Sequence, residues 1–92
     1  MKLENLRKEI DKIDENLVLL LGRRLDVVKK IAKVKKRDNL PAEDKIREKE
    51  VLTKVKQLGD MVGLNSQWLI KIFQLIIKES KRFTSHGLPF RR

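Results

Sequence analysis

The chain has 92 residues, no cysteine, a single histidine and a formal net charge of +10, from 23 lysines and arginines against 13 aspartates and glutamates. Without cysteine there is no disulfide framework or thiolate metal site, and one histidine cannot form a cluster of ligands, so a mononuclear metal enzyme is not expected, although carboxylates alone could hold Mg²⁺. Neither a bound metal nor a cofactor is expected for this chain. The positive charge favours an anionic partner, which is nucleic acid, acidic lipid or a small polyanionic metabolite.

The first predicted element is a long helix over about 3–37. Apolar residues recur there at gaps of three and four from Leu3 to Val34, without proline, which is the pattern of a helix with a coiled-coil-like seam. Such a helix is about 50 Å long and cannot bury its stripe within so short a chain. Association with other copies is expected, and the natural partner is the same helix of a second chain.

Two shorter helices and a tail follow, over about 42–58, about 66–83 and about 85–92. Pro41 suits the first turn of the second helix, with two acidic residues after it. Asn65 or Ser66 caps the third helix, and Gly87 and Pro89 bar its continuation. With no strand pattern in the sequence, the predicted fold class is all-α, a three-helix chain with one long N-terminal helix.

Each predicted helix carries polar residues where its apolar stripe predicts apolar ones. Arg24 occupies a position of the first seam, and eleven residues on, after three turns, Lys35 returns to within about 20° of the same face. Carboxylates continue the stripe of the second helix, and hydroxyls continue that of the third. These residues, with one neighbouring arginine, are Arg24, Lys35, Asp44, Arg47, Glu48, Ser80 and Thr84.

The pair on the first helix indicates the size of a ligand. The Cα atoms of Arg24 and Lys35 are expected about 16 Å apart, and the gap between their long side chains suits a small dianion. Val28, Ile31 and Ala32 would form an apolar floor.

A buried cation without a partner is costly, so a carboxylate must neutralise Arg24. It can come from the protein, with Glu48 as the candidate, or from a ligand. Taken singly, each residue has a plain structural interpretation: Arg24 as an interface ion pair, Ser80 as a serine bonded to its own helix backbone. Together, cations, a carboxylate and hydroxyls indicate a site for a polar, anionic small molecule.

Four segments, taken in combination, resemble the all-helical class of chorismate mutases: LRKEIDKIDENLVLLLGRR, KVKK, LPAEDKIREKEVL and IFQLIIKES. The resemblance runs from about Leu3 to Ser80 without a gap. It implies an intertwined helical homodimer of three-helix chains, with two active sites that each use residues from both chains. It also implies conversion of chorismate to prephenate in phenylalanine and tyrosine biosynthesis.

The resemblance implies roles for three cations. Arg7, reaching over from the partner chain, and Arg24 bind the two carboxylates of chorismate. Lys35 binds a carboxylate and the ether oxygen.

It further implies that Asp44, through its backbone N–H, and Glu48 hold the ring hydroxyl. Arg47 supports the carboxylate side, and Ser80 contacts the substrate near a carboxylate. The last catalytic position departs from the family, which usually has Gln or Glu there as a donor to the ether oxygen, whereas this chain has Thr84. Threonine is shorter and reaches the oxygen only through water.

Two other residues are alternative donors to the ether oxygen, Ser85 and His86, if the end of the third helix is distorted.

The implied chemistry agrees with the absence of a nucleophilic triad. The rearrangement of chorismate is pericyclic and needs neither a nucleophile nor a proton transfer. The protein must hold the dianion in its folded conformer and stabilise the negative charge that grows on the ether oxygen. A fixed cation such as Lys35 does this best in a dry pocket.

Two alternatives stay open. A pyruvate-lyase acting on isochorismate shares the fold, and Thr84 leaves it possible. A non-catalytic basic helical dimer that binds nucleic acid or a partner protein agrees with the charge, although four aromatic residues offer little base stacking.

The chain is expected to form one chorismate mutase domain over 1–92. No secretory signal and no membrane-spanning apolar run is apparent in the sequence, so the expected location is the cytoplasm and no membrane partner is expected.

Overall fold

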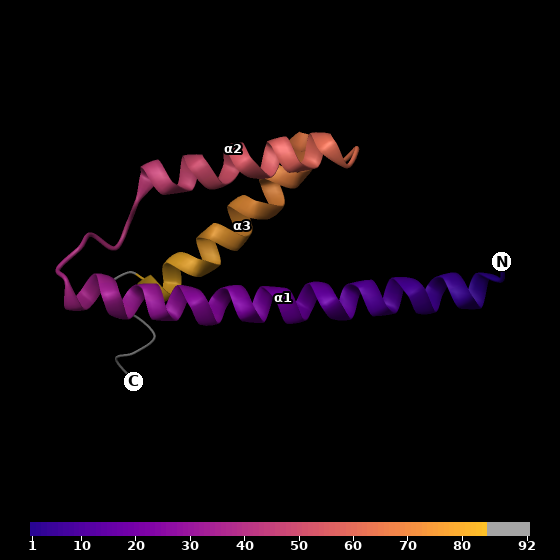
Figure 1. Ribbon diagram of the computed structural model, residues 1–92, viewed down its shortest axis with the longest axis horizontal. Helices are drawn as coiled ribbons and strands as arrows, with labels where there is room; N and C mark the ends of the chain where they lie inside the picture. Colours follow the sequence, from indigo (N-terminus) through magenta and orange to yellow (C-terminus); the bar gives the residue numbers. More distant parts are fainter. Residues whose placement is uncertain (85–92) are drawn as a thin grey trace.

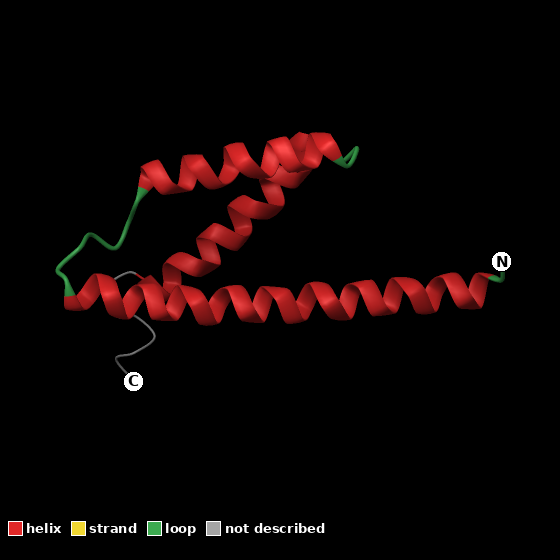
Figure 2. Cartoon of the chain, viewed as in Figure 1, coloured by secondary structure: helices red, strands yellow, loops and turns green. Residues whose placement is uncertain are grey.

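The structure is a computed structural model that describes residues 1–84, and these form three α-helices (Figure 2). Helix α1 spans Leu3–Arg37, α2 spans Lys45–Met61 and α3 spans Ser66–Thr84. Residues 1–84 contain no strand. The predicted all-α class, with one long N-terminal helix, is confirmed. The tail predicted over about 85–92 lies outside the described residues.

Helix α1 is a straight rod that runs the full length of the molecule (Figure 1). Its 35 residues span about 52 Å, and the longest dimension of the molecule is 55 Å. The other two helices lie on the side of α1 that leads into α2, and the N-terminal end of α1 projects beyond them. The radius of gyration is 16.5 Å, against about 12 Å for a compact chain of this length.

Helix α3 holds the chain together, because it packs against both α1 and α2 while α1 and α2 do not pack on each other. Its apolar face, which includes Phe73 and Ile76, is half-buried. Helices α2 and α3 approach closely at Gly59, where an added Cβ would lie 2.7 Å from Cδ2 of Leu69. Yet Val55 is the only buried hydrophobic side chain among residues 1–84, so one chain encloses very little core.

The helix ends follow local capping. Helix α2 begins at Lys45, three residues after the predicted start at 42, because Asp44 is its N-cap: the Asp44 carboxylate accepts a hydrogen bond of 2.9 Å from the Arg47 backbone N–H. It ends at Met61, beyond the predicted 58. Of the two caps predicted for α3, Asn65 fills the role, because its Oδ1 accepts from the Trp68 N–H at 2.9 Å.

Candidate active site

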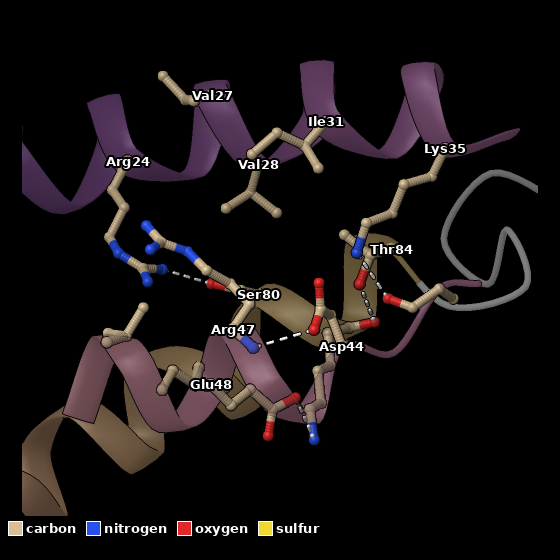
Figure 3. A pocket seen from close by; sticks show the side chains of 14 residues that line it. Arg24, Val27, Val28, Ile31, Lys35, Asp44, Arg47, Glu48, Ser80 and Thr84 are labelled. Carbon is tan, nitrogen blue, oxygen red and sulfur yellow. Dashed lines mark hydrogen bonds and ion pairs between the residues drawn. The ribbon is translucent and has the colours of Figure 1, made fainter. Parts of the chain in front are cut away.

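A cavity of about 510 Å³ lies where the C-terminal half of α1, the start of α2 and the end of α3 come together (Figure 3). The structure brings to its walls seven of the eight residues singled out in the sequence, namely Arg24, Lys35, Asp44, Arg47, Glu48, Ser80 and Thr84. All three helices therefore border one hollow, and each contributes polar residues to it.

Arg24 is half-buried and held by the end of α3. Its guanidinium donates a hydrogen bond of 2.7 Å to the Ser80 hydroxyl, which itself donates to the Ile76 carbonyl at 2.9 Å. Burial, and then the positive charge of Arg47, lower the pKa of Arg24. Within residues 1–84 no carboxylate forms an ion pair with Arg24. Its charge is oriented by a neutral hydroxyl and remains available to an anion.

Lys35 lies at the other end of the same face of α1. Its Nζ donates a hydrogen bond of 3.0 Å to the Ala42 carbonyl in the link before α2. Figure 3 shows Arg24 and Lys35 both reaching from α1 towards α2, with Val28 between them. Val28 and Ile31 line the cavity as expected, whereas the expected Ala32 does not, and Val27 takes part instead.

The start of α2 contributes two carboxylates, those of Asp44 and Glu48, and both residues line the cavity. The Asp44 side chain caps the helix, which leaves its backbone N–H as the group that the family resemblance assigns to the substrate. Arg47 donates to Glu50 at 3.3 Å on the exposed side of α2. Glu48 pairs with a lysine rather than with Arg24, which excludes Glu48 as the partner of Arg24 in this structure.

That lysine is Lys81, a lining residue that the sequence analysis missed. Its Nζ lies 3.0 Å from Oε2 of Glu48. The signal was present, because Phe73, Ile77 and Lys81 are spaced by four and a polar residue again continues an apolar line. It was overlooked because a lysine next to Ser80 at a helix end has an ordinary explanation in the helix dipole.

Thr84 lines the cavity at the end of α3. Its hydroxyl donates a long hydrogen bond of 3.5 Å to the Lys81 carbonyl, within its own helix. The alternative donors, Ser85 and His86, lie outside the described residues. The structure therefore offers a short, backbone-bonded hydroxyl at the position where a longer amide or carboxyl side chain is usual in the family.

Arg7 is the one predicted site residue that its own chain does not bring to the cavity. It is exposed on α1, and the seventeen residues to Arg24 correspond to about 25 Å along the helix. Its predicted role requires a second chain and stays a prediction.

Residues 1–84 contain neither a metal-binding cluster nor a membrane-spanning helix. No group of three or more histidine, cysteine or acidic side chains is placed to hold a metal ion. Over the same residues, no helix combines the length and apolar character needed to cross a membrane.

Fold and cavity together define the class: an all-helical protein with a small-molecule site that offers cations, a carboxylate and hydroxyls to a polar anion. Comparison with known proteins gives the family. The family described as chorismate mutase type II matches residues 6–85, and the chain belongs to it. This confirms the family resemblance of the four sequence segments.

Named relatives agree with this assignment. A chorismate mutase of Methanocaldococcus jannaschii is 32% identical over 80 residues, which cover 87% of this chain and 81% of the relative. A bifunctional chorismate mutase/prephenate dehydratase of Buchnera aphidicola subsp. Schizaphis graminum is 44% identical over 76 residues, 83% of this chain and 20% of the relative. The corresponding bifunctional protein of Escherichia coli K12 is 33% identical over 75 residues, which cover 82% of this chain and 19% of the relative. The chain thus spans about a fifth of the length of the bifunctional relatives.

Proposed function

We propose that the chain is a chorismate mutase that rearranges chorismate to prephenate, and that the cavity is its active site. The observation that carries the proposal is the placement of Arg24 and Lys35 at two ends of one apolar floor, in a chain of this family. The volume of about 510 Å³ falls in the range of small-molecule sites. A cytoplasmic location and a place in phenylalanine and tyrosine biosynthesis belong to the same proposal.

In the proposed mechanism, charged groups held in fixed positions bind chorismate in its reactive conformer. Chorismate carries two carboxylates, and its reactive conformer folds the side chain over the ring. Arg24, already oriented by Ser80, takes one carboxylate with its paired donors. Lys35, oriented by the Ala42 carbonyl, lies where charge develops on the ether oxygen as the C–O bond breaks. The two cations fix the conformer and favour the transition state.

The polar groups of α2 fit the other end of the substrate. Glu48 is an acceptor for the ring hydroxyl, and the Asp44 backbone N–H is a donor to it. No side chain exchanges a proton with the substrate. Thr84 is short and bonded to its own helix, so Lys35 carries most of the stabilisation at the ether oxygen in this chain.

The test is a timed incubation of the purified protein with chorismate, following the loss of diene absorbance and identifying the product by NMR. Prephenate formed well above the uncatalysed rate supports the proposal. A parallel incubation with isochorismate tests the lyase alternative, because that reaction releases pyruvate. Acceleration of neither reaction, together with salt-sensitive binding to DNA, would instead favour the nucleic-acid alternative.

We propose further that the working form is a homodimer joined along α1. The seam residues of its N-terminal half are exposed in the single chain, from 38% for Leu6 to 61% for Leu3. A contiguous apolar surface of this kind on a water-soluble chain marks a contact with another molecule.

The middle of α1 argues for an intertwined contact rather than a simple two-helix seam. The five residues from Leu17 to Leu21 are all apolar, and their exposed fractions range from 46% to 66%. Because consecutive residues point to all sides of a helix, one partner helix cannot cover them. Helices of a second chain are needed on more than one face of α1.

In such a dimer Arg7 of one chain belongs to the cavity of the other, and mixing two inactive variants tests this. Arg7→Ala and Arg24→Ala chains would each be inactive as homodimers. If Arg7 acts in trans, every mixed dimer contains one site with both arginines intact, so full exchange restores about a quarter of the wild-type activity. If Arg7 acts in cis, the mixture stays inactive, which would contradict the proposed arrangement.

A further inference from the structure

Lys81 connects two acidic side chains at the wall of the cavity. Its Nζ lies 3.0 Å from Oε2 of Glu48 and 3.2 Å from Oε2 of Glu43. Hydrogen bonds to Glu48 and then to Glu43 raise the pKa of the ammonium group. Only the first carboxylate, Glu48, also lines the cavity.

These contacts join parts of the chain that have few other links. Glu43 lies in the segment before α2, Glu48 in the first turn of α2, and Lys81 in the last turn of α3. Helix α2 does not pack on α1, so at this end of the cavity α3 provides the support for α2. A lysine that reaches across from α3 fixes where the first turn of α2 presents its carboxylate.

Glu48 needs such a restraint because other cations compete for it. Arg24 and Arg47 line the same cavity, and a glutamate with three rotatable bonds turns readily towards a guanidinium, which binds carboxylates in paired geometry. Arg47 is already paired with Glu50, but a Glu48 that neutralised Arg24 would withdraw that guanidinium from an anionic ligand. It would also leave the hydroxyl of the ligand without its acceptor.

The balance of charges that line the cavity also supports a role for Lys81. One chain contributes four cations and two carboxylates to the wall, Arg24, Lys35, Arg47 and Lys81 against Asp44 and Glu48. A bound dianion therefore leaves these groups electrically neutral. Without Lys81 the Glu48 carboxylate would face a dianion with one cation fewer to offset the repulsion.

We infer that Lys81 is a positioning residue, which holds the Glu48 carboxylate on the cavity wall and away from Arg24 and Arg47. The site then offers a hydroxyl acceptor and the Arg24 guanidinium at the same time. This inference rests on the proposed mutase activity and extends it with a residue outside the set that the family resemblance supplies.

The test is a double-mutant cycle on chorismate turnover, with kcat and KM measured separately. Lys81→Met, which keeps the length of the side chain and removes its charge, should lower kcat/KM about tenfold, within the coupling range of neighbouring charged groups. In the Glu48→Gln background the same change should alter kcat/KM by less than about twofold, because the residue on which Lys81 acts is already lost. Lys81→Arg should restore most of the activity, since it keeps the charge.

Two controls separate positioning from general charge and from folding. Lys78→Met removes one charge from an exposed site on the same helix and should leave kcat/KM unchanged. Glu43→Gln removes the outer anchor, which does not line the cavity, and should cost less than Lys81→Met. Helix content and melting temperature, read by circular dichroism, confirm that each variant is folded.

The possible failures are distinguishable. Equal kcat/KM in wild type and Lys81→Met overturns the inference and leaves the mutase activity intact. An equal loss with Glu48 and with Gln at position 48 also overturns it, because Lys81 would then act on the substrate directly. Wild-type protein that does not accelerate the rearrangement overturns the proposed function, and this inference with it.

Discussion

The two halves of α1 share one heptad pattern but differ in what their own chain offers them. From Arg24 onward the helix meets α3, and Arg24, Leu25, Val28 and Lys35 are half-buried. Before Arg24 every side chain of the helix is exposed. Hydrophobic periodicity therefore identifies a face to be buried without saying which molecule buries it. The half that its own chain partly covers carries the cavity, and the other half offers the proposed dimer contact.

Removing the cations of the cavity half should have the strongest effect on activity. Arg24→Ala and Lys35→Ala should each lower kcat by about 10²–10³-fold, the cost of losing one preorganised group that stabilises transition-state charge. Helix content and dimer mass should not change, because neither side chain lies in the exposed N-terminal seam. Lys33→Ala, an exposed neighbour on the same helix, is the matched control and should retain full activity. Near-wild-type turnover by both folded cavity variants would contradict the site assignment.

A charge introduced into the N-terminal half of α1 should weaken dimerisation without altering the cavity residues. Ile13→Glu should weaken dimerisation at least about a hundredfold, since each dimer loses two buried side chains worth about 2 kcal/mol each and gains two charges. Sedimentation velocity over a range of protein concentrations measures the shift. Activity should fall with it at low concentration and recover in part at high concentration, because the proposed site takes Arg7 from the second chain.

The matched control is Lys8→Gln, which changes the charge by the same single unit on the polar face of the same half of α1 and should leave the dimer intact. An Ile13→Glu chain that sediments like the wild type would show that this face is not the contact.

A small effect on stability is expected from the ion pairs of Lys81 in the cavity half. The pKa of Lys81 in the folded chain is raised by Glu48 and Glu43, so its pairing stabilises the fold fully below the unfolded value near 10.4 and is lost as pH rises through the folded value. Lys81→Met should therefore lower the melting temperature by a few degrees at most at pH 8. The gap from wild type should narrow as the pH is raised past the unfolded value. A gap of constant size across that pH range would exclude the ion pairs as its cause.

The long helix and the position of Arg24 in its seam could be predicted because both depend on spacing along one helix. The start of α2 was placed too early at 42, because Pro41 and the acidic residues after it fit a first helical turn as well as a link. Only the geometry shows that the Asp44 carboxylate accepts from Arg47 and so begins the helix at Lys45.

Contacts between helices are harder to predict from the sequence than positions along one helix. That Ser80, rather than Glu48, would be the partner of Arg24 depends on how α3 crosses α1. The spacing along α3 could have indicated the face on which Lys81 lies, but not its partners, since only the crossing of α2 and α3 puts its ammonium between two glutamates. The spacing of residues along a helix determines the face on which each one lies, whereas the residue it contacts depends on the angle at which two helices cross.

The guanidinium of Arg24 has one more consequence, which concerns alignment. A rod with a regular apolar seam can slide along its partner by a whole heptad, about 10 Å, and still match leucine with leucine. In the proposed dimer such a slide would drive Arg24 against the apolar residues of the other chain and carry Arg7 away from the cavity. A single polar residue in the seam therefore penalises every shifted alignment. In the proposed dimer, the side chain that binds the ligand would therefore also set the register of the two chains.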